Sequence, residues 1–129
     1  MEKIKIAFAT NNNQLLTKEH FGEANEYLIY DVSKTNAILL EIVKNISPEE
    51  KMHGDPNKAK GVASILKPLG VKVLVNKAFG RNISRMQQKF VVIVAKNDDI
   101  LLEIKNIQIN FEKIISEYKK GETRDYLKL

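Results

Sequence analysis

The hydrophobic positions in the first third of the chain recur with the period of β-strands. Residues 4–10 alternate large apolar side chains with small or polar ones, as expected of a strand. Residues 26–32 and 37–45 form two further runs, separated by the polar residues 33–36, which are typical of a tight turn. Three strands with short polar connections predict an antiparallel meander.

From residue 57 onward, helical and strand patterns alternate. Residues 57–67 carry apolar side chains at the spacing of one helix face, and residues 80–88 predict a short second helix. Residues 71–75 predict a strand between these helices. Residues 90–95 are continuously apolar, which predicts a strand buried on both faces.

The last third of the chain is less regular. Apolar residues between positions 107 and 118 follow a helical stripe that Gly121 closes, while residues 100–104 fit either an edge strand or the start of that helix. A meander followed by right-handed crossovers predicts one α/β domain, a five-stranded mixed sheet flanked by helices in a ribonuclease H-like layout. We expect the domain to span residues 1–121 and residues 122–129 to form a charged, frayed tail.

Composition limits the kinds of protein and of metal site. The 129 residues suit one domain with a real core, at an apolar fraction of 43% and a charged fraction of 29%. No apolar run is long enough to cross a bilayer, and residues 1–10 lack a signal-peptide pattern, which predicts a cytoplasmic protein without membrane contact. The absence of cysteine excludes disulfides and thiolate metal sites, including four-cysteine iron–sulfur cradles.

The basic charge favours anionic partners. The formal net charge of +5 attracts polyanions over a long range, and either a nucleic acid or an anionic metallocluster meets that description. The alternative is a lysine-rich protein whose charge serves only solubility, since the lysines form no single block.

Three segments occur together in an order that is typical of one family. They are Glu19-His20-Phe21-Gly22-Glu23-Ala24 between the first two strands, His53-Gly54 in a later loop, and Lys77-Ala78-Phe79-Gly80-Arg81-Asn82 after the fourth strand. Over about residues 3–95 the chain therefore resembles the dinitrogenase iron–molybdenum cofactor biosynthesis family of nitrogenase accessory proteins. The resemblance implies binding of an iron–sulfur or iron–molybdenum type cluster. Many members have a glycine pair where this chain has Asn76-Lys77, and a glycine- and histidine-rich loop where it keeps His53-Gly54.

The two histidines are the candidate metal ligands. His20 and His53 both fall in predicted loops, where binding groups concentrate, and neutral imidazole is a good iron ligand. We expect them to lie near each other and one or both to ligate a cluster or metal. Alternatively, His20 packs or caps a turn and His53 is solvated. With the family pattern, the predicted cofactor-binding residues are His20, Phe21, Gly22, His53, Gly54, Asn76, Gly80 and Arg81.

The segment from Asn76 to Asn82 leads from a strand end into a helix start. Backbone N–H groups at such a start favour anions, Gly80 allows close approach to the backbone, and Arg81 adds a fixed positive charge. An ordinary helix start explains the same residues. Residues 11–13, all asparagine, either line the same end of the sheet or only form a turn.

These observations favour a binding protein over an enzyme. The chain has no nucleophile motif, P-loop or dinucleotide fingerprint, and the first strand lacks the acid that a two-metal nuclease of this layout needs. A nucleic-acid module is disfavoured because the aromatic residues are not interleaved with basic ones on one strand. The predicted function is a metallocluster carrier that receives its cluster from a donor protein and passes it to an acceptor protein. The alternative is a non-metal interaction or regulatory module that has lost the cluster site.

Overall fold

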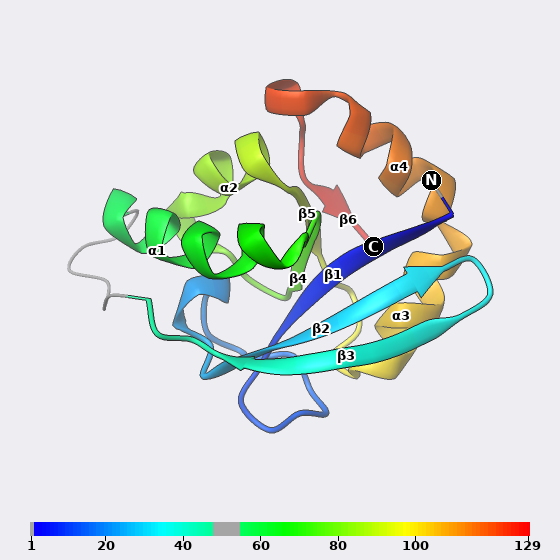
Figure 1. Ribbon diagram of the computed structural model, residues 1–129, viewed down its shortest axis with the longest axis horizontal. Coiled ribbons are helices and arrows are strands. Elements are labelled where there is room, and N and C mark those ends of the chain that lie inside the picture. The colour runs from blue at the N-terminus through cyan, green and yellow to red at the C-terminus, as the bar shows by residue number, and fades with distance from the viewer. Residues whose placement is uncertain (1, 48–54) are drawn as a thin grey trace.

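The computed structural model describes residues 2–47 and 55–129, and in this part of the chain one mixed sheet carries helices on both faces (Figure 1). The strand order is β3-β2-β1-β4-β5-β6. The strands are β1 (Lys3–Thr10), β2 (Glu26–Ser33), β3 (Ala37–Lys44), β4 (Val73–Asn76), β5 (Val91–Val94) and β6 (Leu127–Lys128). The α-helices are α1 (Pro56–Leu66), α2 (Ile83–Lys89), α3 (Ile100–Ile109) and α4 (Phe111–Lys119).

The predicted antiparallel meander is confirmed. Strand β1 pairs with β2 from Lys3 opposite Ser33 to Thr10 opposite Glu26, and β2 pairs with β3. Leu40 is an extra residue in β3, where the register shifts by one position relative to β2. Strand β3 forms one edge of the sheet, and β4 lies on the other side of β1, parallel to it.

One apolar layer lies on each face of the sheet. Figure 1 shows the helices that cover these two faces. Side chains at successive positions of β1 alternate between them: Phe8 packs on the α3–α4 side, and Ala7 and Ala9 pack on the α1–α2 side. Helix α1 contributes Val62 and Leu66 to the second layer at the predicted helix-face spacing. The connections β3–α1–β4 and β4–α2–β5 therefore place α1 and α2 on one face, and the connection β5–α3–α4–β6 places α3 and α4 on the other.

The prediction of five strands was wrong by one strand. Residues 122–129 do not form a charged, frayed tail, because Leu127–Lys128 pairs parallel to β5 as strand β6. Leu127 and Leu129 are buried in the α3–α4 layer. Two apolar positions in a charged segment are too short a pattern to predict a strand, and only pairing with β5 reveals it.

The region left open in the sequence is helical. Asp99 caps α3, since its Oδ1 accepts hydrogen bonds from the backbone N–H of Leu101 at 2.9 Å and of Leu102 at 3.2 Å. Helix α3 ends before Asn110 and α4 begins after it, so two helices replace the single predicted helix. None of the helices in the described residues is long and apolar enough to span a membrane. The ribonuclease H-like layout stays a prediction.

Candidate functional site

The carboxyl ends of the parallel strands β1, β4 and β5 meet at one edge of the sheet. The chain leaves β4 toward α2 on one face and leaves β5 toward α3 on the other, and ligand sites in open α/β sheets form where the direction of the connections changes in this way. The loop after β1 crosses this edge. Leu15 bridges to Asp99 beyond β5, and His20 bridges to Ala78 beyond β4.

The asparagines after β1 form a turn. Thr10 Oγ1 donates to the carbonyl of Leu15 at 2.6 Å and accepts from the N–H of Asn13 at 3.0 Å. The Asn12 side-chain oxygen accepts from the N–H of Gln14 at 3.0 Å and of Leu15 at 2.8 Å. Asn12 thus builds the loop itself, as the turn interpretation expects.

Asn76 holds the loop against the end of β4. Its side chain is fully buried, and its Nδ2 donates to the carbonyls of Glu19 at 2.9 Å and Ala78 at 3.0 Å. Its Oδ1 is buried and accepts no hydrogen bond from the described residues. The amide that stands where many family members have glycine therefore positions the segment that carries His20.

His20 lies directly against Gly80. A Cβ atom placed on Gly80 would lie 2.5 Å from Nδ1 and 2.7 Å from Cε1 of the half-buried imidazole. Gly80 also has a φ of +67°, which a residue with a side chain adopts only with strain. The fold thus joins two predicted site residues that are sixty positions apart in the sequence, and both the ring and the backbone require glycine there.

Phe21 and Gly22 follow His20 in the chain and are buried in the interior. The Phe21 ring is fully buried and stacks on Tyr27 at 4.8 Å and on Phe79 at 5.2 Å between ring centroids. The Tyr27 hydroxyl donates to the carbonyl of Phe21 at 3.0 Å, and burial raises the pKa of Tyr27 well above its ordinary value. Phe21 is therefore an anchor for the preceding histidine and presents no surface to a cofactor.

Lys58 is a buried cation beside this anchor that the sequence prediction missed. Its Nζ lies 3.5 Å from Glu23 Oε1 and donates to Ser47 Oγ at 3.0 Å. A Cβ on Gly22 would lie 3.1 Å from Lys58 Cγ, so Gly22 makes room for the lysine stem. Lys58 falls on the i, i+4, i+8 spacing with Val62 and Leu66, and that spacing is the signal that predicts its burial.

The helix start after β4 has an exposed and a buried side. Arg81 is exposed, whereas Asn82 is buried and its Nδ2 donates to the carbonyl of Asp55 at 3.1 Å. Helix α2 has seven residues after the 3₁₀ turn Gly80–Asn82, so the favourable field of its backbone is short. Arg81 is the fixed positive charge next to the pair of His20 and Gly80.

Two predicted site residues, His53 and Gly54, lie outside the described residues, as does their expected proximity to His20. In the part of the chain that the structure describes, no three histidine, aspartate or glutamate side chains are grouped as a metal site would require. The described cofactor-site residues that come together are His20, Gly80 and Arg81 on the surface, above Phe21, Gly22 and Asn76 in the interior.

The chain is similar to one protein family and to two solved structures. A family model described as dinitrogenase iron-molybdenum cofactor matches residues 2–108. A crystal structure at 1.70 Å resolution of a provisionally assigned dinitrogenase from Methanocaldococcus jannaschii has a TM-score of 0.62 at 18% identity, covering 85% of this chain and 92% of its own. An NMR structure of a provisionally assigned dinitrogenase from Methanococcus jannaschii gives the same score and identity, covering 86% and 92%. At this identity the likeness shows the fold. None of the curated proteins matches the chain.

Proposed function

The chain belongs to the dinitrogenase iron–molybdenum cofactor family, and on this premise we propose that it binds and carries an iron–sulfur or iron–molybdenum type metallocluster during cofactor assembly or delivery. The observation that carries the proposal is the seating of the His20 imidazole on Gly80 at the carboxyl edge of the sheet. The family match spans both residues and the loop between β1 and β2.

The chemistry of the described residues suits transient binding of a metallocluster that is then transferred to another protein. A neutral imidazole is a good iron ligand, and one histidine on a rigid sheet edge leaves most of a cluster's coordination to other groups. His53 is the second proposed ligand, and further ligands would come from the donor or acceptor protein. The exposed Arg81 guanidinium adds a positive charge for an anionic cluster. Such a site releases its cargo readily, as a carrier must.

The proposal assigns binding and no catalysis. Its partners are a protein that donates the cluster and a protein that accepts it. The side chains of Asn76 and Lys58 would act by holding the His20 loop in place, through the bonds to the Glu19 carbonyl and to Glu23.

The test is an anaerobic titration of the purified protein with an iron–sulfur cluster donor, followed by desalting, visible absorption and iron analysis. We expect the wild-type protein to retain iron and show charge-transfer bands. His20→Ala is expected to lose most of the retained iron, and His53→Ala to lower it further. Gln14→Ala is the matched control, since this exposed side chain lies in the same loop. Retention that is equal in His20→Ala and Gln14→Ala would overturn the assignment of the ligand.

One group of observations favours a second function, a non-metal interaction or regulatory module on the same fold. Phe21, Gly22 and Asn76 are engaged in packing and in hydrogen bonds within the protein itself. The same titration distinguishes the two functions. Wild-type protein that retains no iron would contradict the carrier function and support the interaction module.

A further inference from the structure

Positive and negative charges are distributed very unevenly along the chain. Residues 56–97 contain nine lysines and arginines and no aspartate or glutamate. The rest of the chain has twelve basic residues and sixteen acidic ones, so it is net acidic. The formal charge of +5 is therefore the sum of a strongly basic segment and an acidic remainder.

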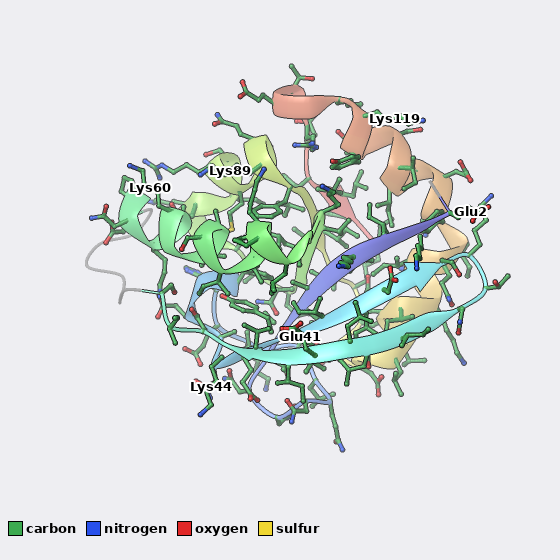
Figure 2. The ribbon with its side chains drawn as sticks, in the orientation of Figure 1. Glu2, Glu41, Lys44, Lys60, Lys89 and Lys119 are labelled. Atoms are coloured by element: carbon green, nitrogen blue, oxygen red, sulfur yellow. The ribbon has the colours of Figure 1, made fainter. Side chains whose placement is uncertain are left out.

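The fold gathers the basic segment on one side of the molecule. Helices α1 and α2 contact each other and bury Val62, Leu66 and Met86 in the same apolar layer, so their exposed sides form one outer surface. Figure 2 shows Lys60 and Lys89 on this side of the molecule. We define the basic face as the exposed cations of this layer, which are Lys60, Lys67, Arg81, Arg85 and Lys89.

Three lysines of the basic face, Lys60, Lys67 and Lys89, form no ion pair within the described residues. Among the lysines of residues 56–97, Lys58 pairs with Glu23 and Lys77 pairs with Asp98, and both of these lysines lie off the basic face. Lys67 lies over the Phe90 ring at 5.6 Å. The exposed acid Glu122 lies within the 3₁₀ turn Gly121–Thr123, which contacts α2, and Asp125 follows this turn.

The opposite helical layer provides an internal comparison. Helices α3 and α4 carry the exposed lysines Lys105, Lys113 and Lys119, whereas Glu112 is their exposed acid and Glu103 and Glu117 are buried. Helices α1 and α2 carry exposed cations and no acid at all. Both outer surfaces are therefore cationic, and the α1–α2 side differs because its helices contain no acid that offsets their charge.

We propose that the basic face docks an acidic surface of a partner protein. Half-buried apolar side chains of Ile65, Leu69 and Ile83 lie in the same layer as the cations. An apolar centre with a charged rim is typical of protein–protein interfaces, and charge complementarity accelerates and orients docking. The aromatic rings of this segment, Phe79 and Phe90, are buried, so they offer no platform on which nucleic-acid bases could stack.

The position of the basic face also indicates what kind of surface the cluster donor or acceptor has. Arg81 follows Gly80, which contacts the His20 ring, so the basic face borders the candidate site. An acidic protein docked there would lie next to His20. This step rests on the proposed function and identifies the donor or acceptor as a protein with an acidic patch around its own cluster site.

The docking test uses labelled poly-L-glutamate as the acidic probe and metal-free protein, with fluorescence anisotropy at low and high salt. Lys60, Lys67 and Lys89 are replaced together by glutamate, and the matched control replaces Lys105, Lys113 and Lys119 in the same way. We expect the first variant to bind the probe about tenfold or more weakly at low salt and the control less than about threefold more weakly. Equal weakening in the two variants would overturn a specific face.

A second variant and a second probe complete the experiment. The triple glutamine variant at Lys60, Lys67 and Lys89 removes charge without reversing it, so it reports on the face even if the glutamate variant folds poorly. A duplex oligonucleotide that binds more tightly than poly-L-glutamate, and loses affinity in the same variant, would replace the acidic protein by nucleic acid. Since His20→Ala is expected to lose iron and keep poly-L-glutamate affinity, failure of cluster carriage and failure of docking are measured separately.

Discussion

At the scale of single residues, Gly80 is the position where backbone and side-chain requirements coincide. Gly80 and Gly121 have nearly the same left-handed backbone, with φ of +67° and +65°. A Cβ on Gly121 meets nothing within 4 Å, whereas one on Gly80 would overlap the His20 ring. The two glycines therefore separate backbone strain from displacement of the histidine.

Gly80→Ala and Gly121→Ala are each expected to lower the free energy of unfolding by about 1 kcal/mol through backbone strain. Only Gly80→Ala should also move the His20 ring, because the ring must give way to the new methyl group. Urea unfolding measures the first effect, and NMR of the His20 ring protons measures the second. Ring signals that stay unchanged in Gly80→Ala would contradict the contact.

A second residue with a clear physical consequence is Glu103 in α3. Its side chain is fully buried, and Oε1 accepts from the N–H of Asn97 at 3.3 Å and from Asn97 Nδ2 at 3.1 Å. Burial raises the pKa of Glu103, while the bonds from Asn97 and the charge of Lys77 oppose this shift. The folded protein therefore holds the Glu103 proton more tightly than the unfolded chain does.

A raised carboxyl pKa makes folding less favourable as pH rises from the ordinary pKa of about 4.3 through the folded pKa. Glu103→Gln should thus gain stability relative to wild type at pH 7, and the gain should shrink as the pH falls toward 4. Glu112→Gln is the control of opposite sign, because Lys34 lowers the pKa of Glu112, so its contribution is lost as the pH falls. Urea unfolding across this pH range tests both. A gain for Glu103→Gln that is constant with pH would contradict the shift.

At the scale of secondary-structure elements, the shortest strand has an effect beyond its length. Strand β6 covers the outer edge of β5 and buries Leu127 and Leu129 against α3 and α4. The segment that leads into it is fixed by Arg124, whose Nε donates to the carbonyl of Tyr118 at 3.1 Å. The last residues are therefore part of the core structure.

Leu127→Ala is expected to lower the free energy of unfolding by about 2–4 kcal/mol, because it removes a buried side chain and leaves a cavity. Tyr126→Ala is the neighbouring control, since that ring is 43% exposed, and it should cost less than about 1 kcal/mol. Chemical unfolding of the two variants measures the difference. Equal, small effects would mean that residues 126–129 behave as a tail.

At the scale of the whole molecule, the sheet packs against one apolar layer on each of its two faces. Strands β1 and β4 have neighbours on both sides, and their side chains are buried in both layers. Strand β3 lies at the edge, and Ile38, Leu40 and Ile42 are about half exposed. Stability should therefore decrease from the centre of the sheet toward β3.

Hydrogen exchange followed by NMR measures this gradient directly. The slowest amides are expected in β1 and β4, because they open only with the whole domain, and the amides of β3 that face away from β2 should exchange fastest among the strands. Protection in those β3 amides equal to that in β1 would show that a further strand or a partner covers the edge.

The sequence by itself determined the elements whose signal is local. The alternation in residues 4–10 and the continuous apolar run in residues 90–95 predict strands because side-chain direction depends only on neighbouring positions. The helix face of α1 follows for the same reason. The family could also be predicted, since short segments such as His20-Phe21-Gly22 keep their spacing along the chain.

The tertiary structure decided everything that depends on residues far apart in the chain. The two residues of β6 form a strand only because β5 offers an open edge. His20 lies on Gly80 because the loop after β1 pairs beyond the end of β4. The cations of residues 56–97 form one basic face because two crossovers place α1 and α2 on the same side. Local pattern sets which residues point inward, whereas pairing and packing across the sheet decide what they meet there.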